Sequence, residues 1–311
     1  LKSIPFQYAA DVRSGKIVCG LRIKQAIERF YKSIEVAEGK GYWLDHKKGF
    51  AVIRFFEKII KHTKGKSAGK AFLLSPYQQF TLYNLFAWQT RNEDGEVIRL
   101  IRNVYEKVGK KNGKTAGMAA LSAFVKAFDG EQGAEVYVGA TKEEQAKLCF
   151  SQESDFILKN NILQQLGFKV YQKEIRFTPT NSFMKPLGGD SKTQDGINSH
   201  LTIIDEYHAH KDDSVNFEDS CVNILEGVAE DDTFLVMIHD LDKADDWELE
   251  CNWQKANPNL GVTVSLDFLR KEFIKAKNQP SKIPNFKTKH LNMWVAGLSE
   301  LIPSAYWNKC M

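Results

Sequence analysis

Apolar and charged positions in the first 70 residues follow the spacing of amphipathic helices. Between Tyr8 and Gly39 the apolar side chains recur on one helical face and the charged side chains on the other. Gly49 to His62 repeat this pattern with larger aromatic residues. Lys61 to Lys70 are polar, basic and glycine-containing, which predicts a loop that is either solvated or in contact with a phosphate backbone. The sequence therefore predicts a helical region over residues 1–70.

From residue 71 the pattern changes to strands that alternate with helices. Ser75 is a plausible N-cap and Pro76 suits a first helical position, so a helix is expected to run through Trp88. Thr141 and Glu144 have the spacing of a capping box for a later helix, ending near Lys159. The expected strands are Val97 to Tyr105, Ala134 to Gly139, Phe168 to Pro179, Ser182 to Leu187 and Leu201 to Glu206, and Thr233 to His239 is another short apolar run.

This alternation predicts an α/β fold with a central, mainly parallel sheet flanked by helices, because parallel strands need helical crossovers. We assign residues 71–250 to this core. After Trp253 the chain changes character, with a turn at Asn257 to Gly261 and a helix capped by Ser265. Phe286 to Val295 fits either a helix or an extended connection. Residues 251–311 are therefore expected to form a C-terminal linker or lid subdomain.

The stretch from Val104 to Thr115 has the order of a phosphate-binding loop: a strand, a turn rich in glycine and lysine, and then the helical Ala116 to Phe128. Gly113 lets the backbone approach a phosphate closely. Lys114 is then expected to reach the β- and γ-phosphates, and the hydroxyl of Thr115 to bind Mg²⁺.

The match is incomplete, because Val108 stands where the usual pattern has its first glycine and the nearest one is Gly109. A basic, solvated turn between a strand and a helix is the alternative. One of Gln78 and Gln79, just inside the preceding helix, is a candidate to bind both edges of an adenine through its amide.

Leu201 to Glu206 is a short apolar run that ends in two carboxylates. Such a run predicts a strand buried on both faces, with ligands bound at its carboxyl end. Asp205 is expected to hold Mg²⁺ through water, and Glu206 to polarise a water molecule for attack on the γ-phosphate. A strand that ends in a solvated acidic turn is the alternative. Together with the loop, the acidic pair makes an NTPase the leading hypothesis.

Charge is segregated along the chain more than the net value of +4 suggests. Residues 205–250 hold 16 carboxylates and two lysines, which leaves 41 Lys/Arg and 23 Asp/Glu elsewhere. That basic surplus either attracts a polyanion such as DNA or consists of scattered surface lysines.

Other candidate chemistry is sparse. The five cysteines lie far apart, which indicates free thiols in a reducing compartment. His208 and His210 lack further metal-ligand partners, so packing or supporting roles are favoured. No apolar stretch is long enough to cross a membrane, and a soluble, intracellular protein is expected.

Several separated blocks, in order, resemble the large terminase subunit of tailed bacteriophages, the ATPase that drives DNA into the procapsid. They are Ser75 to Phe80, Val108 to Thr115, Asp195 to His208, Trp253 to Gly261 and Leu291 to Val295. The resemblance implies a P-loop NTPase that uses ATP and Mg²⁺. It also implies double-stranded DNA, a portal protein, a small terminase subunit and other copies in a ring as partners, in the host cell cytoplasm.

The resemblance also implies residue roles. Gln78 is expected to contact adenine, Thr115 and Asp205 to bind Mg²⁺, and Glu206 to be the catalytic residue. The nucleotide-binding loop is expected to comprise Gly109, Lys111, Asn112, Gly113, Lys114 and Thr115. The imperfect first glycine of the family's loop also matches Val108.

The sequence departs from the family in three places. Lys110 stands where related loops carry an arginine proposed to stabilise charge at the γ-phosphate, and lysine offers a point charge instead of a planar fork. A further strand with a small-residue coupling motif is not found between His210 and Asn223, so either the protein lacks it or the sequence joins two segments near Asp213 to Asn216.

The third departure concerns the family's nuclease domain. The chain ends where that domain is expected to begin, so no nuclease domain or activity is expected, and the acidic stretch Asp240 to Glu250 is not assigned to one. Two alternatives to a packaging motor stay open: another DNA-dependent ATPase of the helicase type, and a non-catalytic nucleotide-binding assembly module.

Overall fold

The computed structural model describes residues 3–140, 143–187, 198–207 and 214–295. Two compact units divide the chain. One comprises residues 1–17, 22–106 and 113–237, and the other residues 18–21, 107–112 and 238–311. The division falls inside the candidate phosphate loop, between Asn112 and Gly113. We refer to them as the larger and the smaller unit.

The predicted N-terminal helices are present in the larger unit. They are α1 (Ile4–Arg13), α2 (Leu21–Val36), α3 (His46–Lys58) and α4 (Pro76–Ala87). Asp45 caps α3 by accepting hydrogen bonds from the N–H groups of Lys47 and Lys48. Pro76 opens α4 and Ser75 is its N-cap, as the sequence predicts, and Ser75 also forms a capping box with Gln78. The short 3-10 helix η1 (Gly65–Ser67) lies within the predicted basic loop.

The strand predicted over Val97 to Tyr105 is two strands in different sheets. β3 (Val97–Arg99) pairs with β2 (Trp88–Arg91), which also pairs with β1 (Tyr42–Leu44). β4 (Asn103–Lys107) instead pairs with β10 (Phe234–Ile238). The prediction of one continuous strand is wrong because the backbone changes partners: the N–H of Leu100 bonds the carbonyl of Trp88, and that of Arg102 bonds the carbonyl of Thr233.

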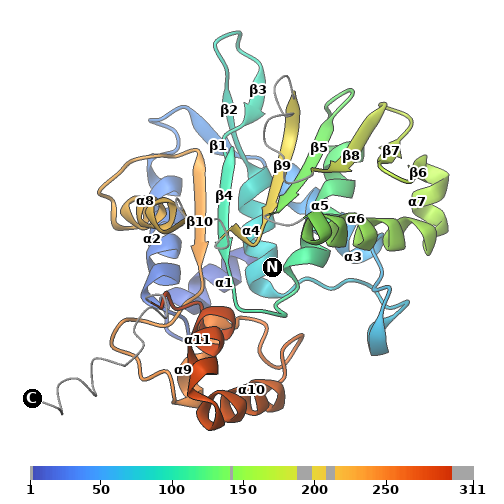
Figure 1. The fold of residues 1–311 in the computed structure, drawn as a ribbon. Helices are drawn as coiled ribbons and strands as arrows, with labels where there is room; N and C mark the ends of the chain where they lie inside the picture. The colour runs from blue at the N-terminus through green and yellow to red at the C-terminus, as the bar shows by residue number, and fades with distance from the viewer. Residues whose placement is uncertain (1–2, 141–142, 188–197, 208–213, 296–311) are drawn as a thin grey trace, which may run out of the picture. The chain divides into compact units, whose positions relative to one another are not determined.

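A five-stranded sheet has the order β6-β7-β8-β5-β9. β5 (Glu135–Ala140) is parallel to both β8 (Ser182–Pro186) and β9 (Ser199–Asp205), whereas β6 (Phe168–Val170), β7 (Ile175–Phe177) and β8 form antiparallel pairs. Helices α5 (Lys114–Phe128) and α6 (Glu143–Leu158) pack against this sheet and each other (Figure 1). The predicted α/β class with a parallel-rich sheet is confirmed. Two further helices are α7 (Asn161–Leu166) and α8 (Ser214–Glu226).

The acidic strand is not buried on both faces, so that prediction is wrong. Ile204 in β9 is 49% exposed and Thr202 is exposed, whereas Ile203 and Asp205 are buried. Successive side chains of a strand point to opposite faces of its sheet. The alternation of buried and exposed residues therefore means that one face of β9 is covered by packing and the other is exposed.

The smaller unit is built around the helices α9 (Glu250–Ala256), α10 (Leu266–Asn278) and α11 (Ile283–Leu291), with the 3-10 turn η4 (Pro280–Lys282) between the last two (Figure 1). Trp253 is fully buried among Leu269, Phe286 and Leu291. Ser265 caps α10 through the N–H of Phe268, as predicted. The sequence left Phe286 to Val295 as either a helix or an extended connection. In the structure this segment is helical up to Leu291, where α11 ends.

Several sequence-based expectations fall on residues outside the described ranges. These are the capping residue Thr141, His208 and His210. Cys19, Cys149, Cys221 and Cys251 are free thiols. In the described ranges, no helix has the length and apolar character needed to span a membrane.

Candidate functional site

The second half of the candidate phosphate loop forms the N-terminus of α5 in the larger unit. Gly113 is the N-cap and has φ of +91°, a left-handed conformation that favours glycine over residues with a Cβ. Lys114 is the first helical residue and Thr115 the second. Helix α5 has 15 residues, so its first-turn N–H groups and its dipole favour an anion.

Gln78 is the glutamine that faces this loop. Its side-chain oxygen accepts hydrogen bonds from the N–H and the hydroxyl of Ser75, at 3.1 and 3.0 Å. Its Nε2 lies 3.4 Å from the position that a Cβ on Gly113 would occupy. Gln79 instead points into the core, where its amide donates to Glu57 and to the carbonyl of Leu74. Residue chemistry alone left both glutamines open, and the structure places Gln78, the one that the family resemblance implies, beside the loop.

Glu106, the residue before the end of β4, is a member of this neighbourhood that the sequence analysis missed. Desolvation raises the pKa of the Glu106 carboxyl, and the positive charge of Lys114 opposes that shift. The pair places a carboxylate beside the lysine expected to bind phosphate. No pattern in the sequence singled this carboxylate out, because β4 has polar residues at Asn103 and Lys107 as well and all its residues are exposed or half-buried.

Asp205 and Glu206 lie at the carboxyl end of β9. Asp205 is 7% exposed and is in register with Ala140 at the end of β5. Its Oδ1 accepts a hydrogen bond of 2.9 Å from the N–H of Glu206. Glu206 has φ of +55°, a left-handed conformation that costs a non-glycine residue roughly 1–2 kcal/mol. Such strain concentrates at functional sites.

Thr115 and Asp205 offer a hydroxyl and a carboxylate oxygen, the hard ligands that Mg²⁺ prefers. The donor set therefore fits the ion that the sequence implies. In the described residues there is no group of three or more His, Cys, Asp and Glu side chains placed to hold a metal. A magnesium ion bound here would depend on water and phosphate oxygens for its remaining ligands.

The first half of the loop belongs to the smaller unit and is held by it. The N–H of Gly109 donates to the carbonyl of Ala256 at 2.9 Å, and the N–H of Lys110 to the carbonyl of Lys289 at 2.8 Å. Val108, which replaces the usual first glycine, is 1% exposed. An apolar side chain at that position is therefore part of the packing.

The two lysines of this half differ. The side chain of Lys110 is exposed, so it is accessible for the role that related loops give to arginine. Lys111 has φ of +72°, and its ammonium lies 3.5 Å from the ring centroid of Phe268. Asn112 is 1% exposed and bonds to Asn257 and Asn259, a role that the sequence analysis did not foresee.

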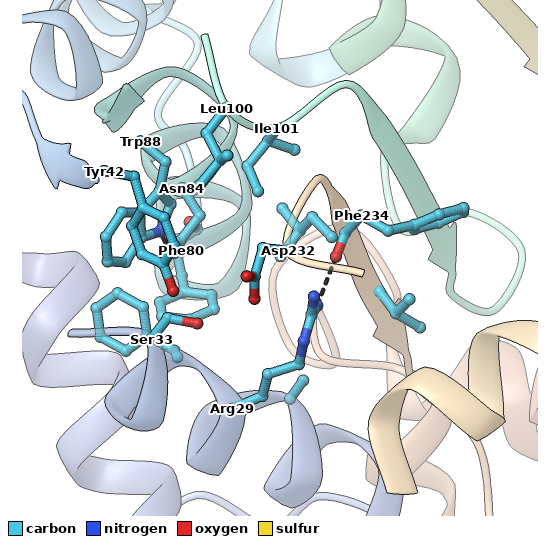
Figure 2. Close-up of a pocket in the computed structure, with 14 residues that line it drawn as sticks. Arg29, Ser33, Tyr42, Phe80, Asn84, Trp88, Leu100, Ile101, Asp232 and Phe234 are labelled. Carbon is cyan, nitrogen blue, oxygen red and sulfur yellow. Dashed lines mark hydrogen bonds between the residues drawn. The ribbon is translucent and has the colours of Figure 1, made fainter. Parts of the chain in front are cut away.

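A cavity in the larger unit lies among α2, α4 and the segment that leads into β10 (Figure 2). None of the predicted site residues lines it. Figure 2 shows the guanidinium of Arg29 donating to the carbonyl of Phe234, and it also donates to the carbonyl of Asp231. Burial lowers the pKa of Arg29, and Asp232 opposes this shift. We interpret Arg29 as a structural link between α2 and the start of β10.

Comparisons with known proteins match two family models to the chain. The model described as the terminase large subunit ATPase domain matches residues 76–231. The model described as the terminase large subunit endonuclease domain matches residues 228–311. All predicted site residues lie in the first match.

The second match shows that the expected absence of a nuclease domain is wrong. The expectation placed the start of that domain at the end of the chain and treated residues 251–311 as a linker, but the endonuclease match begins at residue 228 and includes α9 to α11. The acidic stretch Asp240 to Glu250 also lies inside it. Its side chains form ion pairs: Asp242 and Asp245 with Lys255, Glu248 with Lys277, and Glu250 with Arg270.

Individual relatives agree with these matches. The chain is 24% identical to the terminase large subunit of Enterobacteria phage HK97, covering 85% of this chain and 56% of that protein. It is 30% identical to Protein YmfN of Escherichia coli (strain K12), over 37% of this chain and 32% of that protein. A crystal structure of the HK97 bacteriophage large terminase has a TM-score of 0.65 at 21% identity, covering 84% of this chain and 58% of that one. The chain thus spans little more than half of the HK97 protein.

Proposed function

Because the chain belongs to the terminase large subunit family, we propose that it hydrolyses ATP to translocate double-stranded DNA into a procapsid. The observation that carries the proposal is the match of residues 76–231 to the family's ATPase domain. The fold likeness to the HK97 large terminase supports the same architecture. The accessible N-terminus of α5 supports phosphate binding, because it presents backbone N–H groups to an anion.

In this proposal the triphosphate binds at Gly109 to Thr115, with Lys114 neutralising phosphate charge. Magnesium supplies charge stabilisation at the β- and γ-phosphates, and Thr115 and Asp205 are the residues that would hold it. Glu206 orients and polarises the attacking water. Gln78 contacts the adenine through the amide group that faces Gly113, and Lys110 stabilises charge at the γ-phosphate.

DNA, a portal protein and a small terminase subunit are the proposed partners, and the proposed setting is the host cell cytoplasm. One subunit has no means of holding DNA between strokes, so we propose that several copies work as a ring docked on the portal. The basic surplus outside residues 205–250 supports an electrostatic contribution to DNA binding.

The substitution Glu206→Gln tests the catalytic assignment. It removes the general base but keeps size and polarity, so it should preserve ATP binding and reduce turnover by at least a hundredfold. ATP affinity and steady-state hydrolysis are the measurements, and Glu226→Gln, an exposed carboxylate on α8, is the matched control. Unchanged hydrolysis by Glu206→Gln would remove the assignment. Loss of hydrolysis also separates a motor from a non-catalytic nucleotide-binding module.

The lysines of the loop are distinguished by a second pair of variants. Lys114→Ala should lose most ATP affinity, because its ammonium contacts phosphate in the ground state. If Lys110 stabilises charge that develops on the γ-phosphate during hydrolysis, Lys110→Ala should keep its affinity for ATP and hydrolyse ATP more slowly. If Lys114→Ala bound ATP as tightly as the parent, the phosphate loop would be misplaced.

A further inference from the structure

Three buried asparagines tie the first half of the candidate phosphate loop to the helices of the smaller unit. Asn112, Asn257 and Asn259 are 1%, 0% and 1% exposed. All three belong to the smaller unit, which includes residues 107–112 and 238–311. Polar side chains buried this completely are placed by their hydrogen bonds.

Asn112 is bonded through both ends of its side chain. Its Nδ2 donates to the carbonyl of Gly109 at 2.8 Å and to Oδ1 of Asn257 at 3.0 Å. Its Oδ1 accepts from the N–H of Asn259 at 3.0 Å, and its backbone carbonyl accepts from Nδ2 of Asn259, also at 3.0 Å. An amide is required, because these bonds use a donor and an acceptor on one short side chain.

The other two asparagines anchor these bonds to the helices. Nδ2 of Asn257 donates to the carbonyl of Trp253 in α9 at 2.9 Å and to that of His290 in α11 at 2.8 Å. Asn259 directs its Nδ2 to the loop, while its Oδ1 is buried without a hydrogen-bond partner among the described residues. Leaving the Oδ1 of Asn259 without a hydrogen bond costs free energy. The hydrogen bond from its Nδ2 to the carbonyl of Asn112 therefore holds the side chain in this position.

Gly109 completes the arrangement because the loop lies against the anchor residues. A Cβ at position 109 would lie 2.5 Å from Oδ1 of Asn257, 3.0 Å from the carbonyl oxygen of His290 and 3.1 Å from that of Ala256. With the bonds from the N–H groups of Gly109 and Lys110 to the carbonyls of Ala256 and Lys289, these contacts hold three residues of the loop: Gly109, Lys110 and Asn112.

We propose that Asn112, Asn257 and Asn259 form a clamp that orders Gly109 to Asn112 for the incoming nucleotide. They are positioning residues, and the inference rests on the proposed ATPase function. Ordering a loop before the ligand arrives removes an entropic cost from binding. Once the triphosphate is bound, its own contacts hold the loop, so the clamp raises affinity more than turnover.

Asn259→Ala is the first test. It removes the bond to the Asn112 carbonyl, and amide hydrogen exchange at Gly109 and Lys110 in the nucleotide-free protein should accelerate at least tenfold. ATP affinity should fall about tenfold, equivalent to one buried hydrogen bond of about 1.4 kcal/mol, with kcat within about twofold of the parent value. Asn252→Ala is the control, because Asn252 is in α9 and donates to the carbonyl of Asp246 instead of the loop.

A double-mutant cycle distinguishes a clamp from general loss of structure. Asn112→Ala removes the side-chain bonds of Asn112 but keeps its backbone carbonyl, so Asn112→Ala and Asn259→Ala remove different bonds of the clamp. If the clamp releases the loop as one unit, the double variant Asn112→Ala/Asn259→Ala should weaken ATP binding no more than Asn112→Ala alone. Additive losses would overturn the clamp. If Asn259→Ala alone lowers the melting temperature of the protein, the same comparison still tests whether the asparagines act as one clamp.

The two proposals can fail separately. If Asn259→Ala leaves both the exchange at Gly109 and Lys110 and the ATP affinity unchanged, the clamp is overturned while the ATPase function stands. If the parent protein does not hydrolyse ATP, the function fails, and the hydrogen-exchange comparison still decides whether the asparagines order the loop.

Discussion

Two buried histidines in the smaller unit make the stability of the protein dependent on pH. His239 and His290 are 1% and 4% exposed. Burial lowers their pKa values to about 3 and about 4, so both rings are neutral in the folded protein. The unfolded chain protonates them near pH 6.5.

Stability should therefore be full above about pH 6.5 and fall as the pH decreases below it, because the unfolded state then binds protons that the folded state does not. The two histidines together contribute a slope of at most about 2.7 kcal/mol per pH unit, which is approached near pH 5. Urea denaturation at several pH values measures it. The double variant His239→Gln/His290→Gln should lose most of the slope; an unchanged slope contradicts the assignment.

A buried ion pair joins α5 to α6. The Nζ of Lys126 lies 2.6 Å from Glu153 and 2.8 Å from the hydroxyl of Ser122, and both charged side chains are fully buried. Burial lowers the pKa of Lys126, and Glu153 opposes this shift. Removing one partner leaves a buried charge without compensation, which is costly.

Lys126→Met should therefore lower the free energy of unfolding by about 3–5 kcal/mol. The double substitution Lys126→Met/Glu153→Leu removes both charges and should restore most of that loss. Denaturant titration of the two variants and the parent measures the difference. If Lys126→Met were as stable as Lys126→Met/Glu153→Leu, the charge left on Glu153 would carry no cost, and the prediction would be wrong.

Among the elements, α3 and α4 approach each other most closely at Gly49. A Cβ at that position would lie 2.7 Å from Cδ2 of Tyr83 and 2.8 Å from Cβ of Ala87. Alanine has the higher helix propensity by about 1 kcal/mol, but overpacking costs about 1–3 kcal/mol, so the steric effect should win.

Gly49→Ala is expected to lower the melting temperature. Gly117→Ala is the matched control, because a Cβ at position 117 in α5 meets no atom within 4 Å. That control should raise stability by up to about 1 kcal/mol through helix propensity alone. Thermal unfolding of both variants measures the effect. A stabilised Gly49→Ala would mean that α3 and α4 separate easily.

At the scale of the whole molecule, the segregation of charge predicts how the protein responds to salt. If lysines and arginines outside residues 205–250 contact phosphates, DNA binding should weaken by orders of magnitude between 50 and 200 mM salt, roughly 10³-fold for six contacts. Fluorescence anisotropy with a labelled duplex measures the dependence. Binding that ignores salt would argue against a basic DNA-binding surface.

Local patterns were enough to predict the parts of the fold that depend on neighbouring residues. The capped starts of α4 and α10 and the strand β5 follow from side-chain spacing and capping chemistry. Pairing partners are not local, so the sequence missed the break between β3 and β4 and the exposed face of β9. Whether a segment becomes a strand depends largely on its own residues, but which strand it pairs with depends on residues far away in the sequence.

The sequence by itself determined the family, and it predicted a phosphate loop and an acidic pair, because glycine, lysine, hydroxyl and carboxylate groups at fixed spacing carry their own chemistry. Only the tertiary structure decided that Gln78 and not Gln79 faces the loop, and that Glu106 lies beside Lys114. It also brought Asn257 and Asn259 to Asn112, across about half of the chain. Contacts between residues so far apart depend on how the helices pack, and no local pattern encodes them.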